Sequence, residues 1–185
     1  MKGLIKYLGL ESWFTSLSKD EQRLLIDKYG PDLTENQVGF NSSPSQFLSE
    51  LSSFVNTKDN AVLCEKIVNK ALELQTPINT EDYHFFLMHI MEFYYKNKDK
   101  PEYLELAKKY LQIGIDNSKE SIKSITKNPL YNVSGAPENP FYTNLAILYK
   151  KEKKWTDIIT LCEQGKKEGW PNDFDKRIDE AKKHL

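Results

Sequence analysis

The sequence predicts an all-α protein, and three observations support that prediction. Apolar residues recur three and four positions apart in segment after segment, which is the spacing of one helix face, whereas no segment shows the sustained alternation of a strand. A Ser-x-x-Glu capping box begins at Ser18, so we expect a helix to start at Lys19. Gly30-Pro31 then supplies a helix stop, because glycine adopts the left-handed cap and proline cannot continue the helix.

Residues 1–44 are expected to form N-terminal helices followed by a loop. The stretch GLIKYLGLESWF is mildly amphipathic, and we expect it to fold onto the rest of the protein. Residues 32–44 contain Gly39 together with asparagines and serines, a composition typical of a loop. The positions expected to point inward from the N-terminal helices are Leu4, Ile5, Leu8, Trp13, Phe14, Leu24, Leu25 and Tyr29.

Three helix pairs are expected at 45–78, 81–127 and 139–171. In each pair, inward positions follow steps of three, one and three on the first helix and steps of four and three on the second. The second helix of the middle pair is expected to continue to about Thr126. The inward positions are Leu48, Leu51, Ser52, Val55, Cys64, Val68 and Ala71 in the first pair, Leu87, Ile90, Met91, Tyr94, Ala107, Leu111 and Gly114 in the second, and Tyr142, Leu145, Ala146, Tyr149, Ile158, Cys162 and Gly165 in the third.

The third pair resembles the tetratricopeptide repeat. The residues that carry the resemblance are Tyr142, Leu145, Ala146, Tyr149, Ile158, Cys162 and Pro171, with Trp155 expected to wedge between the two helices. Ala146 stands where the family has glycine, Cys162 stands where it has an aromatic residue, and Pro171, like Pro77 after the first pair, falls one place late. The resemblance implies a divergent, short solenoid of stacked antiparallel helix pairs.

The predicted organisation is therefore a single helical-repeat domain spanning 1–185. An N-terminal segment and loop occupy 1–44, and the segment 128–140 is inserted before the third pair. Residues 172–185 are expected to form a capping helix, which a solenoid needs at its end. The inward positions of that helix are Phe174, Ile178, Ala181 and Leu185.

The same resemblance implies that a partner protein or peptide binds in a concave groove formed by the first helix of each pair. Subtracting the inward positions leaves an apolar and aromatic centre with polar residues around it, a mixture suited to a segment of another protein. The expected partner-binding residues are Phe85, Met88, His89, Glu92, Tyr95, Asn144, Ile147 and Lys150. Whether the N-terminal helices or the 128–140 insertion cover this groove is left open.

Composition points away from several other classes of protein. The 26 basic and 27 acidic residues give a formal charge of −1, and only Arg23 and Arg177 are arginines, so no nucleic-acid partner is expected. No secretory signal and no membrane-spanning stretch are apparent, which favours a cytoplasmic protein without integral membrane association. Cys64 and Cys162 both fall on apolar helix faces and are expected to be buried, reduced thiols.

Catalytic chemistry is not expected, and neither is a cofactor or a metal. Glu81-x-x-His84 resembles half of a di-iron carboxylate site, but the chain offers no second copy of the motif. A metal-dependent or hydrolytic enzyme using His84, His89 and Glu92 is one alternative to the binding module. The other alternative is a structural subunit that self-associates as a homo-oligomer through Trp13, Phe14 or Trp170.

Overall fold

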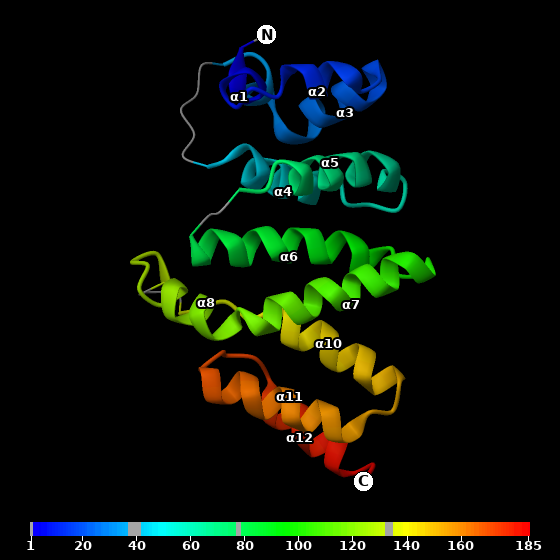
Figure 1. Ribbon diagram of the computed structural model, residues 1–185, viewed down its shortest axis with the longest axis vertical. Coiled ribbons are helices and arrows are strands. Elements are labelled where there is room, and N and C mark those ends of the chain that lie inside the picture. Colours follow the sequence, from blue (N-terminus) through cyan, green and yellow to red (C-terminus); the bar gives the residue numbers. More distant parts are fainter. Residues whose placement is uncertain (1, 37–41, 77–78, 132–134) are drawn as a thin grey trace. The chain divides into compact units, whose positions relative to one another are not determined.

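Helices supply all the regular secondary structure in the described part of the chain, as the sequence predicts (Figure 1). The computed structural model describes residues 2–36, 42–76, 79–131 and 135–185. Gly39 of the predicted loop, Pro77 after the first pair and residues 132–134 of the insertion lie outside the described residues. The contacts divide the chain into unit 1, residues 1–78 and 92–97, and unit 2, residues 79–91 and 98–185.

Unit 1 begins with the short helices α1 (Gly3–Tyr7) and α2 (Glu11–Ser16), then α3 (Lys19–Tyr29) and the 3-10 turn η1 (Pro31–Leu33). The capping box at the start of α3 is present: the Glu21 amide donates to Ser18 Oγ at 3.2 Å and the Ser18 amide donates to Glu21 Oε2 at 2.8 Å. Gly3 has a positive φ and approaches the η1 backbone too closely for a β-carbon. α1 therefore packs directly on the segment that follows α3.

The segment of the predicted first pair contains α4 (Pro44–Val55) and α5 (Ala61–Glu73), which pack against each other. All seven of its predicted inward positions are buried. A second capping box, which the sequence analysis does not identify, starts α4 with Ser43 and Gln46. The ion pair between Lys66 Nζ and Glu21 Oε1, at 2.6 Å, links α5 to α3 and lowers the pKa of the Glu21 carboxyl.

The long helix α6 (Thr80–Lys96) contributes residues to both units. Its C-terminal end belongs to unit 1, where Phe93 and Tyr94 are buried and the Lys96 ammonium donates to the carbonyl of Asn56. Its N-terminal part belongs to unit 2, where Phe86, Leu87 and Ile90 are buried.

Unit 2 continues with α7 (Pro101–Asp116) and α8 (Ser118–Ile125), and here the prediction of one helix running to Thr126 is wrong. The helix is interrupted at Asn117, whose side chain donates to the carbonyl of Ile113 at 2.8 Å. Ser118 Oγ lies 2.6 Å from the carbonyl of Ile115, and its single hydrogen is shared between that carbonyl and the Glu168 carboxylate. These side chains compete with the backbone ladder, so the chain turns and α8 follows a new direction (Figure 1).

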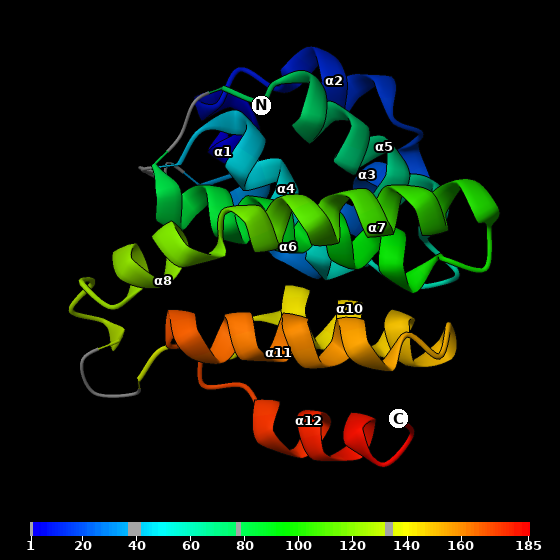
Figure 2. The same ribbon diagram turned by 60° about the horizontal axis from the view of Figure 1, so that its bottom comes forward.

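The described part of unit 2 after α8 contains the helices α10 (Pro140–Lys151), α11 (Trp155–Glu168) and α12 (Phe174–Lys182). α11 packs against both of the others, and the two views show it beside them (Figures 1 and 2). The predicted inward positions of this region are buried, except for Tyr149, which is half-buried, and Leu185, which is 75% exposed because α12 ends before it. Trp155 is also half-buried and stacks on His184, with ring centroids 4.1 Å apart.

Two glycines hold the helices of unit 2 at close range. A β-carbon on Gly114 of α7 would lie 2.4 Å from the ring of Phe141 on α10, and one on Gly165 of α11 would lie 2.4 Å from the ring of Phe174 on α12. Both rings are buried. Each aromatic ring thus occupies the space that the missing side chain leaves.

Replacing Gly114 with alanine is expected to lower the free energy of unfolding by about 1–3 kcal/mol, because the methyl group overpacks the contact with Phe141. Chemical denaturation measures the change, and Glu105→Ala at an exposed position of the same helix is the control. In a Phe141→Leu background the cost of Gly114→Ala should fall. An equal cost in both backgrounds would show that the ring is not the cause.

Candidate partner-binding surface

Helix α6 carries the centre of the predicted partner-binding residues. Phe85, Met88 and His89 lie in its unit 2 part at steps of three and one, which places them on one face of the helix. Each of the three is half-buried, whereas Phe86 and Leu87 beside them are buried. Leu87 is among the expected inward positions, whereas the burial of Phe86 is not expected from the sequence.

His89 has an environment that a surface histidine lacks. Its Nδ1 atom is buried and has no hydrogen-bond partner within the described structure. Burial also lowers the pKa of the imidazole, which favours the neutral ring. A neutral imidazole with an unused nitrogen can form one more hydrogen bond, as donor or acceptor according to its tautomer.

Glu92 and Tyr95, the other two predicted residues of α6, belong to the part of the helix in unit 1. Both are half-buried, and burial raises the pKa of each side chain. For Glu92 the nearby Lys96 ammonium opposes that rise. They continue the helical spacing of Phe85, Met88 and His89 along α6.

The three predicted residues on α10 do not share one environment. The side-chain amide of Asn144 donates to the sulfur of Met91 at 3.7 Å, which turns Asn144 toward α6. Lys150 instead pairs with Glu180 of α12 at 2.5 Å, so it lies on a different side of α10. Ile147 is half-buried. The structure thus brings Asn144 together with α6 and separates Lys150 from it.

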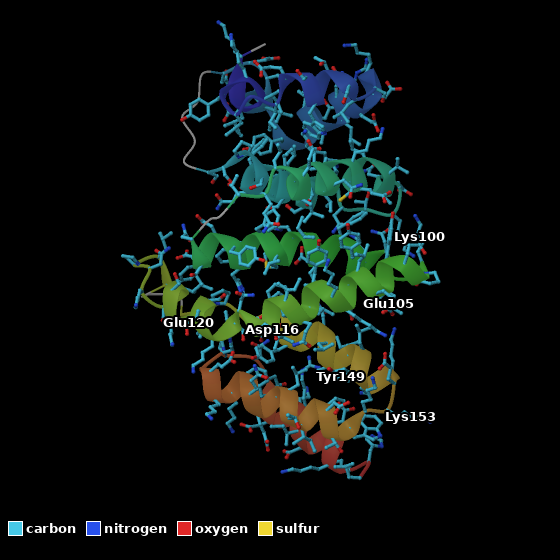
Figure 3. The ribbon with its side chains drawn as sticks, viewed as in Figure 1. Lys100, Glu105, Asp116, Glu120, Tyr149 and Lys153 are labelled. Carbon is cyan, nitrogen blue, oxygen red and sulfur yellow. The ribbon has the colours of Figure 1, made fainter. Side chains whose placement is uncertain are left out.

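The lysine-rich turn between α10 and α11 is tied to its surroundings by ion pairs. Lys154 pairs with Glu152 at 2.6 Å, and Glu152 also accepts from Lys108 of α7 at 3.1 Å. Lys154 Nζ lies 5.6 Å from the ring centroid of Tyr149. Figure 3 shows Tyr149 and Lys153 at the end of unit 2 that also carries Lys100. These exposed charges neutralise one another locally.

Glu81 and His84, the residues of the alternative metal or catalytic site, have separate contacts in the structure. Glu81 Oε1 accepts from the side chain of Asn128 at 2.8 Å. His84 is 2% exposed, stacks on Trp170 with ring centroids 5.2 Å apart and meets the edge of Phe141 at 5.3 Å. Burial lowers the pKa of His84 to about 4. Across the described residues, no group of three His, Cys, Asp or Glu side chains is placed to hold a metal ion.

The residues considered for self-association are mostly occupied inside their own units. Phe14 and Trp170 are buried, and Trp13 is half-buried. The two cysteines are free and buried as predicted, and burial raises the pKa of the Cys64 thiol to about 12 and that of Cys162 to about 11.

A polar network at the end of α11 is not apparent from the sequence. Glu168 Oε2 accepts from Tyr142 at 2.8 Å and from Ser118 at 2.5 Å, and these three residues come from α11, α10 and α8. A lysine-lined cleft lies beside this carboxylate. The spacing of Lys119 and Lys123 by four residues is the only signal in the sequence, and it does not reveal that α8 packs on α11.

The comparisons with known proteins leave the family open. No protein-family model, no curated protein and no solved structure matches the chain. Among the described helices, none has the length and apolar character needed to cross a membrane.

Stability is expected to fall as the pH drops from about 6.5 toward 4, because the unfolded chain binds a proton at His84 that the folded chain excludes. The folded pKa of about 4 against the ordinary 6.5 makes this contribution about 3 kcal/mol. His84→Gln should remove that part of the pH dependence in denaturation curves. His184→Gln, at an exposed position, is the matched control and should keep it. If the free energy of unfolding changes with pH as steeply in His84→Gln as in the unmodified chain, His84 is not the cause of this pH dependence.

Proposed function

We propose that this protein is a tetratricopeptide-like interaction module, an adaptor or regulator that binds a segment of another protein. The paired helices α4 and α5, and α10 and α11, support the repeat interpretation, because each pair is joined by a short turn and packs along its predicted inward positions. Binding is assigned to the face of α6 that carries Phe85, Met88 and His89.

The observation that carries the proposal is the composition of that face. Phe85 and Met88 present apolar surface that the fold does not fully bury, and the half-buried His89 follows Met88 in the same helical spacing. Aromatic and methionine side chains are enriched at protein interfaces, and methionine adapts its shape to different partners. An amphipathic or extended segment of another protein would cover these apolar atoms.

The cytoplasm is the proposed compartment. Cys64 and Cys162 are unpaired, buried thiols, a state that a reducing compartment maintains. Buried thiols with raised pKa values are also poor nucleophiles and poor metal ligands, so their proposed role is packing.

Photo-crosslinking in cells tests whether α6 meets a partner. A benzophenone side chain introduced at Met88 should capture a specific protein, whereas the same group at Val62, an exposed residue of α5, should not. Capture of the same proteins from both positions would mean non-specific contact and would contradict the assignment to α6.

Replacing Met88 with alanine is then expected to weaken the binding of the captured partner by about 1–2 kcal/mol, because an interface contact is lost. Calorimetric titration with the purified partner measures the change. Met88→Leu keeps the volume and apolar character and should bind nearly as well, and Val62→Ala should have no effect. If Met88→Ala binds like the unmodified chain, α6 is not the binding face.

A further inference from the structure

A cleft in unit 2, separate from the α6 face, concentrates positive charge. It has a volume of about 360 Å³ and is lined by Lys119 and Lys123 of α8 and by Gln164, Lys167 and Glu168 of α11. The two helices pack together where α11 ends, and both views show α8 beside that end (Figures 1 and 2). The volume lies within the range of small-ligand sites, about 300–1,000 Å³.

The lysines of the cleft have more positive charge than nearby carboxylates neutralise. Lys119 and Lys123 are four residues apart and so share a face of α8. Lys123 pairs with Glu120 at 2.7 Å, whereas Lys119 and Lys167 have no ion pair within the described residues. The hydrogen bond from Lys123 is the main cause that lowers the pKa of Glu120, and the charges of Lys119 and Lys127 lower it further. Figure 3 shows Glu120 on α8, near Asp116 at the end of α7.

The negative group of the cleft, Glu168, is already committed to the fold. Its Oε2 atom accepts from Ser118 at 2.5 Å and from Tyr142 at 2.8 Å, and its Oε1 atom accepts from Gln164 at 3.0 Å. Ser118 and Tyr142 are buried, with exposed fractions of 0% and 1%. Because Tyr142 and Gln164 donate to the carboxylate and Ser118 shares its hydrogen with it, much of its acceptor capacity is used within the fold, which weakens its competition for the lysine ammonium groups.

We propose that this cleft binds a phosphate monoester. Three lysines and one glutamate give the lining a formal charge of +2, and a phosphate monoester carries about −1.5 to −2 at neutral pH. Lysine binds phosphate as a point charge from several directions, which suits an open cleft that contains no arginine fork. This site uses residues of α8 and α11 alone, so it stands whether or not α6 binds a partner protein.

The ester can come from a small metabolite or from a phosphorylated side chain of a protein. Calorimetric titration at constant ionic strength with phenyl phosphate, with a phosphoserine peptide and with the same peptide unphosphorylated distinguishes the two sources. We expect both phosphorylated probes to bind and the unphosphorylated peptide to fail. Tighter binding of the phosphopeptide identifies a protein as the source, and equal binding identifies a small molecule.

The variant Lys119→Gln/Lys123→Gln/Lys167→Gln should lower the affinity for both phosphorylated probes by about tenfold or more, because one charge-assisted contact alone contributes about that factor. The matched control, Lys151→Gln/Lys182→Gln/Lys183→Gln, removes the same charge at exposed positions of unit 2 and should change binding by no more than the general loss of positive charge requires. Equal losses in the two triple variants, or no binding of phosphate to the unmodified chain, would overturn the proposal.

The Glu168→Gln variant supplies a test of opposite sign. Removing the carboxylate charge should tighten phosphate binding several-fold, since the amide oxygen of glutamine still accepts from Tyr142 but the side chain no longer repels the ligand. A thermal melt confirms that the variant is folded. Weaker binding in a folded Glu168→Gln variant would mean that the carboxylate itself contacts the ligand, and the phosphate assignment would then be wrong.

Discussion

The fit of a phenylalanine ring against a glycine is the constraint on which the geometry of unit 2 depends. Phe141 reaches the backbone of α7 because Gly114 has no side chain, and Phe174 reaches the backbone of α11 because Gly165 has none. Once Phe141 is seated, the start of α10 is fixed, and with it Tyr142, whose hydroxyl supports Glu168. The position of Glu168 in the lining of the lysine cleft therefore depends on the packing of α10 against α7.

A second restraint acts on the same end of α10. The backbone amide of Asn139 donates to Asn172 Oδ1 at 2.9 Å, and Asn172 Nδ2 donates to the backbone carbonyl of Asn139 at 2.9 Å. Asn139 Oδ1 also caps α10 by accepting from the Phe141 amide. The segment before α12 is thus held to the start of α10 by the hydrogen bonds of its buried Asn172, which helps to fix the register in which the rings meet the glycines.

The sequence predicts the helices and their inward faces well because both depend on local spacing. Leu48, Val68 and Leu111 follow the helical period and are buried. The break at Asn117 is missed because Ile115 and Ile122 continue the apolar pattern across it, while the cause lies in polar side chains that bond to the backbone. Periodicity reports which face is apolar and carries no information about such competition.

The candidate sites are less predictable, because they depend on which helices meet. Spacing alone places Phe85, Met88 and His89 on one face of α6. It cannot show that Lys150 turns toward Glu180 on α12, or that Lys119 and Lys167 line one cleft from residues 48 positions apart in the sequence. Both arrangements follow from the packing of α10, α11 and α12 and from the turn between α7 and α8.

The two cysteines give each unit an internal reporter of its own opening. Cys64 lies in unit 1 and Cys162 in unit 2, and neither forms a disulfide. Because both thiols are buried and their pKa values are raised, a thiol reagent reaches them only after the surrounding helices separate. The rates at which the two sulfur atoms are modified therefore measure local opening in each unit separately, without an added label.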